Sequence, residues 1–253
     1  MKASWMFQNL ASRARFALRH PAYTLRSLLN EVLLADERFL AEATGVPVRK
    51  LRTFLNEPFR SQGFSTHLAA CRAELQGLKI QSAAPFGKKI LLQYALIRAV
   101  QPDAVVETGV ANGVSSAYLL LALQTNGRGR LHSIEVGDAA FLPKGKTVGW
   151  VVPDWLRERW QLHIGDSTKV LPALLPRIAP IDVFIHDSLH TYEHMMEEFV
   201  CTYPFLRPYG FLLADDALWN ESFREFSDQV KARYARILHG VGFLRKENSH
   251  TGV

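Results

Sequence analysis

The chain has 253 residues, a formal net charge of +6 and 48% hydrophobic residues. This length and composition suit one large folded domain with an appendage. The two cysteines, Cys71 and Cys201, are far apart and lack metal-type spacing, which argues against a disulfide scaffold and favours a reducing, cytoplasmic compartment. No apolar run reaches the roughly 18 residues of a membrane helix, and the N-terminus lacks the apolar core of a signal peptide.

The first 30 residues carry the most uneven charge distribution. They contain five basic residues and no acid, with aromatic residues interleaved. Such a segment can lie on an anionic membrane at the inner face, target an organelle, or form a helix that packs on the domain. We leave these three interpretations open.

Residues 21–78 show apolar positions at three- and four-residue spacing, which predicts helices. Within them, Ala41, Gly45 and Leu51 have the spacing of a helix-turn-helix, with phosphate contacts available from Arg49, Lys50 and Arg52. Two helices that meet at a glycine are far commoner than DNA readers, so we do not expect nucleic acid as a partner. Residues 79–86 resemble a linker, and we therefore divide the chain into a helical appendage, 1–80, and a second domain, 81–253.

Strands and helices alternate after a helix predicted over 87–100. The predicted strands cover 104–107, 130–136, 161–164, 181–186 and 211–214, and two further β-like runs flank Gly240. The segments between the first five strands are long enough for crossover helices. The fold class is therefore α/β, a Rossmann-like doubly wound and mainly parallel sheet with a C-terminal antiparallel hairpin.

The first strand runs into a glycine turn, in the sequence AVVETGVANGVSS from 104 to 116. Gly109 and Gly113 allow a tight turn and a close approach to a ligand, and the next helix offers free N–H groups. The carboxylate of Glu107 would repel a pyrophosphate, and the spacing differs from that of dinucleotide folds and P-loops. S-adenosylmethionine fits these residues better than NAD or ATP. A purely structural turn remains the alternative.

Acidic residues follow each of the five strands, at the edge where an α/β sheet binds its ligand. Glu135 is placed to accept hydrogen bonds from a ribose diol, and Asp166 from an adenine amine. Acids at the strand ends can also cap the following helices. The residues expected to bind the cofactor are Glu107, Gly109, Asn112, Gly113, Ser115, Glu135, Gly165, Asp166, Ser167 and His186.

These motifs resemble those of the class I S-adenosylmethionine-dependent methyltransferases. Glu107, Gly109, Gly113 and Ser115 look like the first motif of the catechol-type O-methyltransferases. The stretches IDVFIHDSLHTYEHMMEEF and FLRPYGFLLADDALW are similar to the macrocin-type enzymes of sugar-modifying pathways. The resemblance covers residues 100–246.

The resemblance also implies a metal ion and a base. In those families a divalent cation is held by an acid after the fourth strand and two adjacent groups after the fifth, positions that Asp187, Asp215 and Asp216 match. Hard oxygen ligands suit Mg²⁺ or Mn²⁺, and few neutralising side chains are expected nearby. His190 stands where the macrocin-type enzymes place a histidine base, with Asp187 beside it in the catalytic set; His190 could instead cap a helix.

Residues 137–160 lie between the second and third strands and carry Trp150 and Trp155, with Gly145 and Gly149 as hinges. They form either a lid that excludes water or a structural loop pinned by the tryptophans.

The sequence therefore predicts an S-adenosylmethionine-dependent, metal-assisted O-methyltransferase. Its acceptor would be a hydroxyl of a small molecule or glycan unit. Two alternatives remain: a metal-independent methyltransferase acting on nitrogen or a carboxylate, and a DNA-binding regulator whose α/β domain senses the cofactor. The acceptor's identity and the state of a homo-oligomer stay open.

Overall fold

The computed structural model describes residues 34–77, 87–137 and 142–248. A seven-stranded sheet with the order β3-β2-β1-β4-β5-β7-β6 forms its centre. The strands are β1 (Ala104–Thr108), β2 (Arg130–Glu135), β3 (Trp160–Ile164), β4 (Ile181–His186), β5 (Leu206–Ala214), β6 (Tyr234–Leu238) and β7 (Val241–Arg245). The first five pair in parallel, and β7 pairs antiparallel with both β5 and β6. The predicted fold class, including the C-terminal hairpin, is confirmed.

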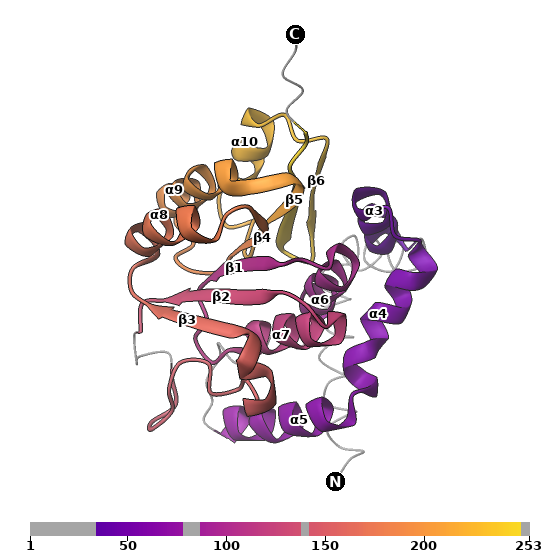
Figure 1. Ribbon diagram of the computed structural model, residues 1–253, viewed down its shortest axis with the longest axis vertical. Coiled ribbons are helices and arrows are strands. Elements are labelled where there is room, and N and C mark those ends of the chain that lie inside the picture. The colour runs from indigo at the N-terminus through magenta and orange to yellow at the C-terminus, as the bar shows by residue number, and fades with distance from the viewer. Residues whose placement is uncertain (1–33, 78–86, 138–141, 249–253) are drawn as a thin grey trace, which may run out of the picture.

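Helices cover both faces of this sheet (Figure 1). One face carries α6 (Lys88–Val100) and α7 (Val114–Asn126), and the other carries α8 (Ser167–Ile178), α9 (Tyr192–Thr202) and α10 (Ser222–Gln229). Alternate strand residues point to opposite faces, so Val105 joins the α6 and α7 core while Val106 joins the α8 to α10 core. The short 3₁₀ helices η3 (Asp154–Arg159) and η4 (Tyr203–Phe205) precede β3 and β5.

Three N-terminal helices pack outside α6 and α7: α3 (Ala35–Thr44), α4 (Val48–Arg60) and α5 (Gln62–Gly77). Their buried residues, among them Leu40, Leu51 and Phe64, belong to the same hydrophobic core as α6 and α7. Glu57 on α4 also accepts hydrogen bonds from Tyr94 and Arg98 on α6. Residues 34–77 are therefore packed into the main core.

The predicted meeting of two helices at Gly45 is present, with φ at +74° where α3 ends. Leu51 and Phe54 on α4 face the core, whereas Arg49, Arg52 and Arg60 line an outer hollow of about 350 Å³. The basic segment 1–30 and the linker 79–86 lie outside the described residues. Within the described part of the chain, no helix combines the length and apolar character needed to cross a bilayer.

Strand boundaries differ from the prediction mainly at β5. It begins at Leu206 rather than at residue 211, because Leu206 pairs with Ile181 of β4 before the register shifts. Tyr209, with φ at +64°, and Gly210 lie within this irregular stretch, where the alternation of apolar residues is lost. Sequence periodicity therefore identified only the regular half of the strand.

Candidate functional site

The carboxyl ends of the five parallel strands lie along one edge of the sheet. His186, the last residue of β4, pairs with Ala214, the last residue of β5, so Asp187 and Asp215 leave neighbouring strands at the same level. Thr108 of β1 pairs with His186 on the other side of β4. The predicted convergence of strand ends is therefore present.

The turn after β1 packs tightly against the chain that follows β4. Gly109 has φ at +83°, and a Cβ there would lie 1.8 Å from the Asp187 carbonyl oxygen. Gly113, with φ at +84°, begins α7, and a Cβ there would lie 2.7 Å from Cα of Gly149. Only glycine fits these two places, so the cradle and the acidic strand end are parts of one structure.

Glu135 at the end of β2 fixes the conformation of this turn. Its Oε2 accepts hydrogen bonds from the backbone N–H groups of Val110 and Ala111, both at 2.8 Å. Oε1 has a longer contact with the N–H of Gly137, at 3.4 Å. One carboxylate oxygen thus holds the turn, while the other makes only this longer contact among the described residues.

Glu107 lies beneath the turn and is fully buried. Its Oε1 accepts hydrogen bonds of 2.5 Å from Ser116 on α7 and from Ser133 on β2. Burial raises the pKa of Glu107 to about 7, although both hydroxyl groups oppose the shift. Through these hydrogen bonds the carboxyl group of Glu107 connects β1 to α7 and to β2. The motif serine Ser115 is half-buried in the first turn of α7, and its neighbour Ser116 makes the hydrogen bond to Glu107.

The three residues after β3 lie at the start of α8. Asp166 caps the helix, accepting a hydrogen bond of 3.0 Å from the N–H of Thr168, which with the Thr168 hydroxyl lowers the pKa of Asp166. The Ser167 hydroxyl is buried and contacts His194 on α9. Gly165 has φ at +155° and connects the strand to this cap. Helix capping is thus the structural role of Asp166, and its adenine contact stays a prediction.

The described part of the segment between β2 and β3, residues 142–159, is attached to the glycine turn. Gly149 N–H donates to the Ala111 carbonyl oxygen, and Val151 N–H donates to that of Asn112. The Trp150 indole donates to Oδ1 of Asn112 at 2.7 Å, which leaves the buried Nδ2 of Asn112 without a partner among the described residues. These contacts favour the structural loop over the lid.

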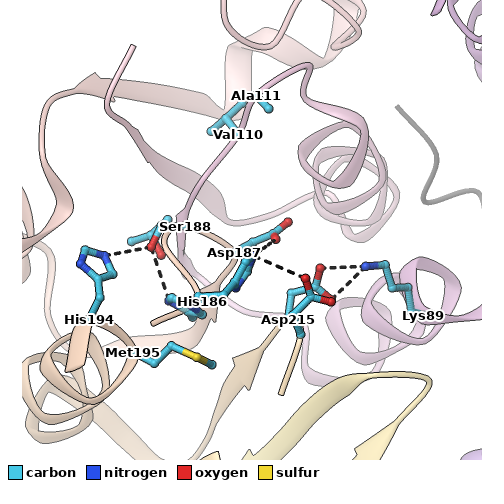
Figure 2. Close-up of polar contacts among 12 residues, drawn as sticks. Lys89, Val110, Ala111, His186, Asp187, Ser188, His194, Met195 and Asp215 are labelled. Atoms are coloured by element: carbon cyan, nitrogen blue, oxygen red, sulfur yellow. Dashed lines mark hydrogen bonds and ion pairs between the residues drawn. The ribbon is translucent and has the colours of Figure 1, made fainter. Parts of the chain in front are cut away.

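The three predicted metal ligands meet a neutralising group that the sequence analysis did not expect. Lys89, the second residue of α6, places Nζ 2.7 Å from Oδ2 and 3.0 Å from Oδ1 of Asp215 (Figure 2). Burial would lower the pKa of Lys89, but the hydrogen bond and charge of Asp215 outweigh it and raise that pKa. One neutralising side chain, Lys89, is therefore present at the acids.

Asp187 lies between this ion pair and the glycine turn. Burial and the adjacent Asp215 carboxylate raise the pKa of Asp187 well above its ordinary value of 3.8, and its side chain shares a hydrogen bond with Asp215. No group of three or more His, Cys, Asp or Glu side chains within residues 34–77, 87–137 and 142–248 is arranged to hold a metal ion. The acids are neighbours, but one of them, Asp215, is paired with an ammonium group.

His190 lies near both Asp187 and Asp216. Its Nε2 is 3.8 Å from Oδ1 of Asp187 and 3.7 Å from Oδ2 of Asp216, and its ring packs edge-on against Trp219. Burial and the nearby His186 lower the pKa of His190, which favours the neutral imidazole. A neutral ring with a nitrogen between two carboxylates can accept a proton and hold the resulting charge.

His186 belongs to a buried polar network behind this edge. Its Nδ1 lies 2.7 Å from Oε2 of Glu198, which also accepts a hydrogen bond from Thr108. The other oxygen, Oε1, contacts His194 at 3.0 Å and accepts a hydrogen bond from Ser188 at 2.8 Å. The hydrogen bonds from the two histidines lower the pKa of Glu198 despite its burial. His186 is fully buried beneath the edge, and its predicted cofactor contact stays a prediction.

Sequence reasoning missed the helix residues of the site, namely Lys89, Glu198 and His194. The spacing of His194 and Glu198, four residues apart on α9, was a usable signal because it places both on one helix face. Lys89 gave a weaker one. Two lysines in the first turn of a helix oppose its dipole, which suggests an acidic partner.

Comparison with known proteins finds a family model that matches part of the chain. The sequence model of a family described as a methyltransferase domain matches residues 106–217, which include every predicted site residue. A search of curated proteins finds no match to the chain.

Several solved structures share the fold. The O-methyltransferase TomG from Streptomyces achromogenes, involved in tomaymycin synthesis and solved with S-adenosylmethionine, is 19% identical with a TM-score of 0.57, over 72% of this chain and 90% of TomG. An O-methyltransferase from Bacillus cereus, solved with S-adenosylhomocysteine, is 14% identical with a TM-score of 0.56, over 72% and 91%. Cofactor-bound Rv0187 from MTB is 18% identical with a TM-score of 0.56, over 78% and 96%.

Residues 106–217 therefore match a family described as a methyltransferase domain, and the described residues have the fold of the class I S-adenosylmethionine-dependent methyltransferases. The resemblance inferred from its motifs to this class is confirmed.

Proposed function

We propose that this chain transfers a methyl group from S-adenosylmethionine to a hydroxyl group of a small molecule or glycan unit. The observation that carries the proposal is the position of His190 Nε2, between Asp187 and Asp216 at the edge that also holds the glycine turn. A base beside the cofactor cradle is what deprotonation of an acceptor hydroxyl requires.

The cradle fits the cofactor. Gly109 and Gly113 hold the turn in positive-φ conformations, packed against the chain after β4 and against Gly149, and Oε1 of Glu135 has no hydrogen bond shorter than 3.4 Å among the described residues. That oxygen would accept hydrogen bonds from the ribose diol, and Asp166 would accept one from the adenine amine. The bound cofactor supplies a methyl group on a cationic sulfur, and the carboxylates at this edge favour that charge.

His190 would accept the proton of the acceptor hydroxyl through Nε2. The acceptor oxygen then forms its bond to the methyl carbon, the carbon–sulfur bond breaks, and its electron pair neutralises the sulfonium. Asp187 and Asp216 would stabilise the imidazolium that forms on His190. Much of the acceleration would come from holding acceptor and methyl group in line, so the protein's main task is positioning.

The surface beside His190 suits a ring-shaped acceptor. Trp219 is 70% exposed, with its ring centroid 5.4 Å from that of His190, and Leu218 and Leu189 are also exposed there. An exposed indole next to the base offers a stacking surface for a sugar or a phenol. This surface favours an acceptor that contains a ring rather than one that is a flexible chain.

The predicted Mg²⁺ or Mn²⁺ does not fit the observed arrangement. The oxygen donors of Asp187, Asp215 and Asp216 have the chemistry these ions prefer, but both oxygens of Asp215 contact Lys89. We therefore assign no step to a metal, and deprotonation falls to His190.

Transfer of a labelled methyl group to sugars, phenols and lipid-linked glycans tests the proposal. We expect wild type to label at least one hydroxyl acceptor, and His190→Ala to lower the rate by about 10² to 10⁴ while binding cofactor as before. Labelling confined to amines or carboxylic acids would favour the alternative methyltransferase. Equal rates for wild type and His190→Ala would contradict the assigned base.

A further inference from the structure

Lys89 is the one described lysine or arginine whose side chain bonds directly to the acids after β4 and β5. Its ammonium contacts both oxygens of Asp215, whose side chain is 9% exposed, while the side chain of Lys89 is 28% exposed. The lysine charge also acts on Asp187 and Asp216. Figure 2 shows Lys89 approaching from α6 and Asp187 lying on the other side of Asp215.

This contact competes with a divalent ion for the same oxygens. An ion bound to Asp215 would have to displace the ammonium from both of its hydrogen bonds or lie close to it, and like charges a few ångströms apart repel strongly where solvent is limited. Lys89 thus supplies, at this edge of the sheet, positive charge that a divalent ion would otherwise supply.

The structure around Lys89 holds it in position. α6 is packed in the core, and its neighbour Lys88 forms an ion pair of 2.8 Å with Asp36 on α3. Further along α6, Arg98 binds Glu57 on α4. A lysine in the first turn of a helix opposes the helix dipole, so the pairing with Asp215 offsets an unfavourable placement. The N-terminal helices therefore help to fix a charge at the site.

We propose that Lys89 is the resident cation of the acidic strand ends and that methyl transfer in this chain proceeds without a divalent ion. The inference rests on the proposed function for its catalytic part, while its metal-binding part stands independently. Lys89 neutralises Asp215, which leaves Asp187 and Asp216 to act on His190. Lys89 is thus a positioning residue: no bond to it forms or breaks, and the proton of the acceptor goes to His190.

Mn²⁺ binding measured by electron paramagnetic resonance and calorimetry, with S-adenosylhomocysteine present, tests this directly. We expect wild type to show no stoichiometric Mn²⁺ site and to transfer methyl groups in excess EDTA. In Lys89→Met, which keeps most of the side-chain volume but loses the charge, we expect Mn²⁺ affinity to rise by about tenfold or more. Its transfer rate should fall and recover in part when Mn²⁺ is added.

Lys88→Met is the matched control, because it removes the adjacent charge on the same helix without touching Asp215. It should bind Mn²⁺ no better than wild type, so a gain seen in both variants would contradict the proposal. A stoichiometric Mn²⁺ site in wild type, or loss of wild-type transfer in EDTA, would overturn it whether or not Lys89→Met folds. Failure of wild type to bind S-adenosylhomocysteine would instead refute the proposed function. In that case the Mn²⁺ affinities of wild type, Lys89→Met and Lys88→Met, measured without S-adenosylhomocysteine, would still decide the role of Lys89.

Discussion

Glu135 uses one carboxylate oxygen to hold the glycine turn, and its other oxygen has only a 3.4 Å contact, with the N–H of Gly137, among the described residues. Glu135→Ala removes two charge-assisted hydrogen bonds to the backbone, each worth about 1.5–3 kcal/mol, together with the proposed ribose contact. We expect the Kd for S-adenosylmethionine to rise by about 10- to 100-fold in calorimetry. Glu158→Ala, an exposed acid on η3, should bind as wild type does. Unchanged affinity in Glu135→Ala would refute the predicted contact.

The network around Glu198 predicts a pH dependence of stability. The hydrogen bond to Glu198 raises the pKa of His194 above its ordinary value of 6.5, although burial opposes it. The resulting stabilisation is complete below pH 6.5 and is lost as the pH rises through the raised pKa of the folded protein. Glu198 has a lowered pKa, so its own contribution to stability is present above pH 4.5 and is lost as the pH falls through the lowered pKa of the folded protein.

Urea denaturation at pH steps from 5 to 9 measures this effect, as the difference in unfolding free energy between wild type and His194→Gln. The difference isolates His194, because Glu107, with a pKa raised to about 7, titrates in both proteins. We expect the advantage of wild type to shrink above pH 6.5. A difference that is constant with pH would show that His194 carries no extra charge in the folded protein.

The glycine turn and the chain that follows β4 constrain each other. A Cβ at Gly109 would meet the Asp187 carbonyl, whereas Gly127, which ends α7 with φ at +72°, has nothing within 4 Å of its Cβ position. Gly127→Ala should cost about 1–2 kcal/mol from its backbone conformation alone. Gly109→Ala should cost about 1–3 kcal/mol more, because the backbone must move. Chemical denaturation compares them, and equal costs would mean that the close approach at Gly109 contributes nothing.

The elements also show what the sequence could predict. Each of the five parallel strands has an acid at its end or within two residues of it, so the polar edge and all the strands except the first half of β5 could be identified from residue order. The role of Lys89 could not be predicted, because Lys88 and Lys89 are equivalent in sequence. Only the packing of α6 decides which of the two reaches Asp215. A charge supplied by a distant helix is not visible in the strand-end motifs, and the metal stays a prediction of those motifs.

At the scale of the whole molecule, α3 to α5 belong to the main core. Leu51 on α4 is fully buried in the cluster that also contains residues of α6 and α7. Leu51→Ala should therefore lower the unfolding free energy by about 2–5 kcal/mol. Chemical denaturation measures this change, and we expect the variant to unfold in a single transition. Arg52→Ala, on the exposed face of the same helix, should change it by no more than about 0.5 kcal/mol. A separate early transition in Leu51→Ala would indicate that the N-terminal helices unfold on their own.

The central claim is that the edge formed by the glycine turn, Glu135 and the acids after β4 and β5 binds S-adenosylmethionine. Isothermal titration of the wild-type chain with S-adenosylmethionine, and with S-adenosylhomocysteine, tests it most directly. We expect saturable binding of both compounds at one site per chain, and a weaker affinity in Glu135→Ala. No saturable binding of either compound to folded wild-type protein would contradict the account.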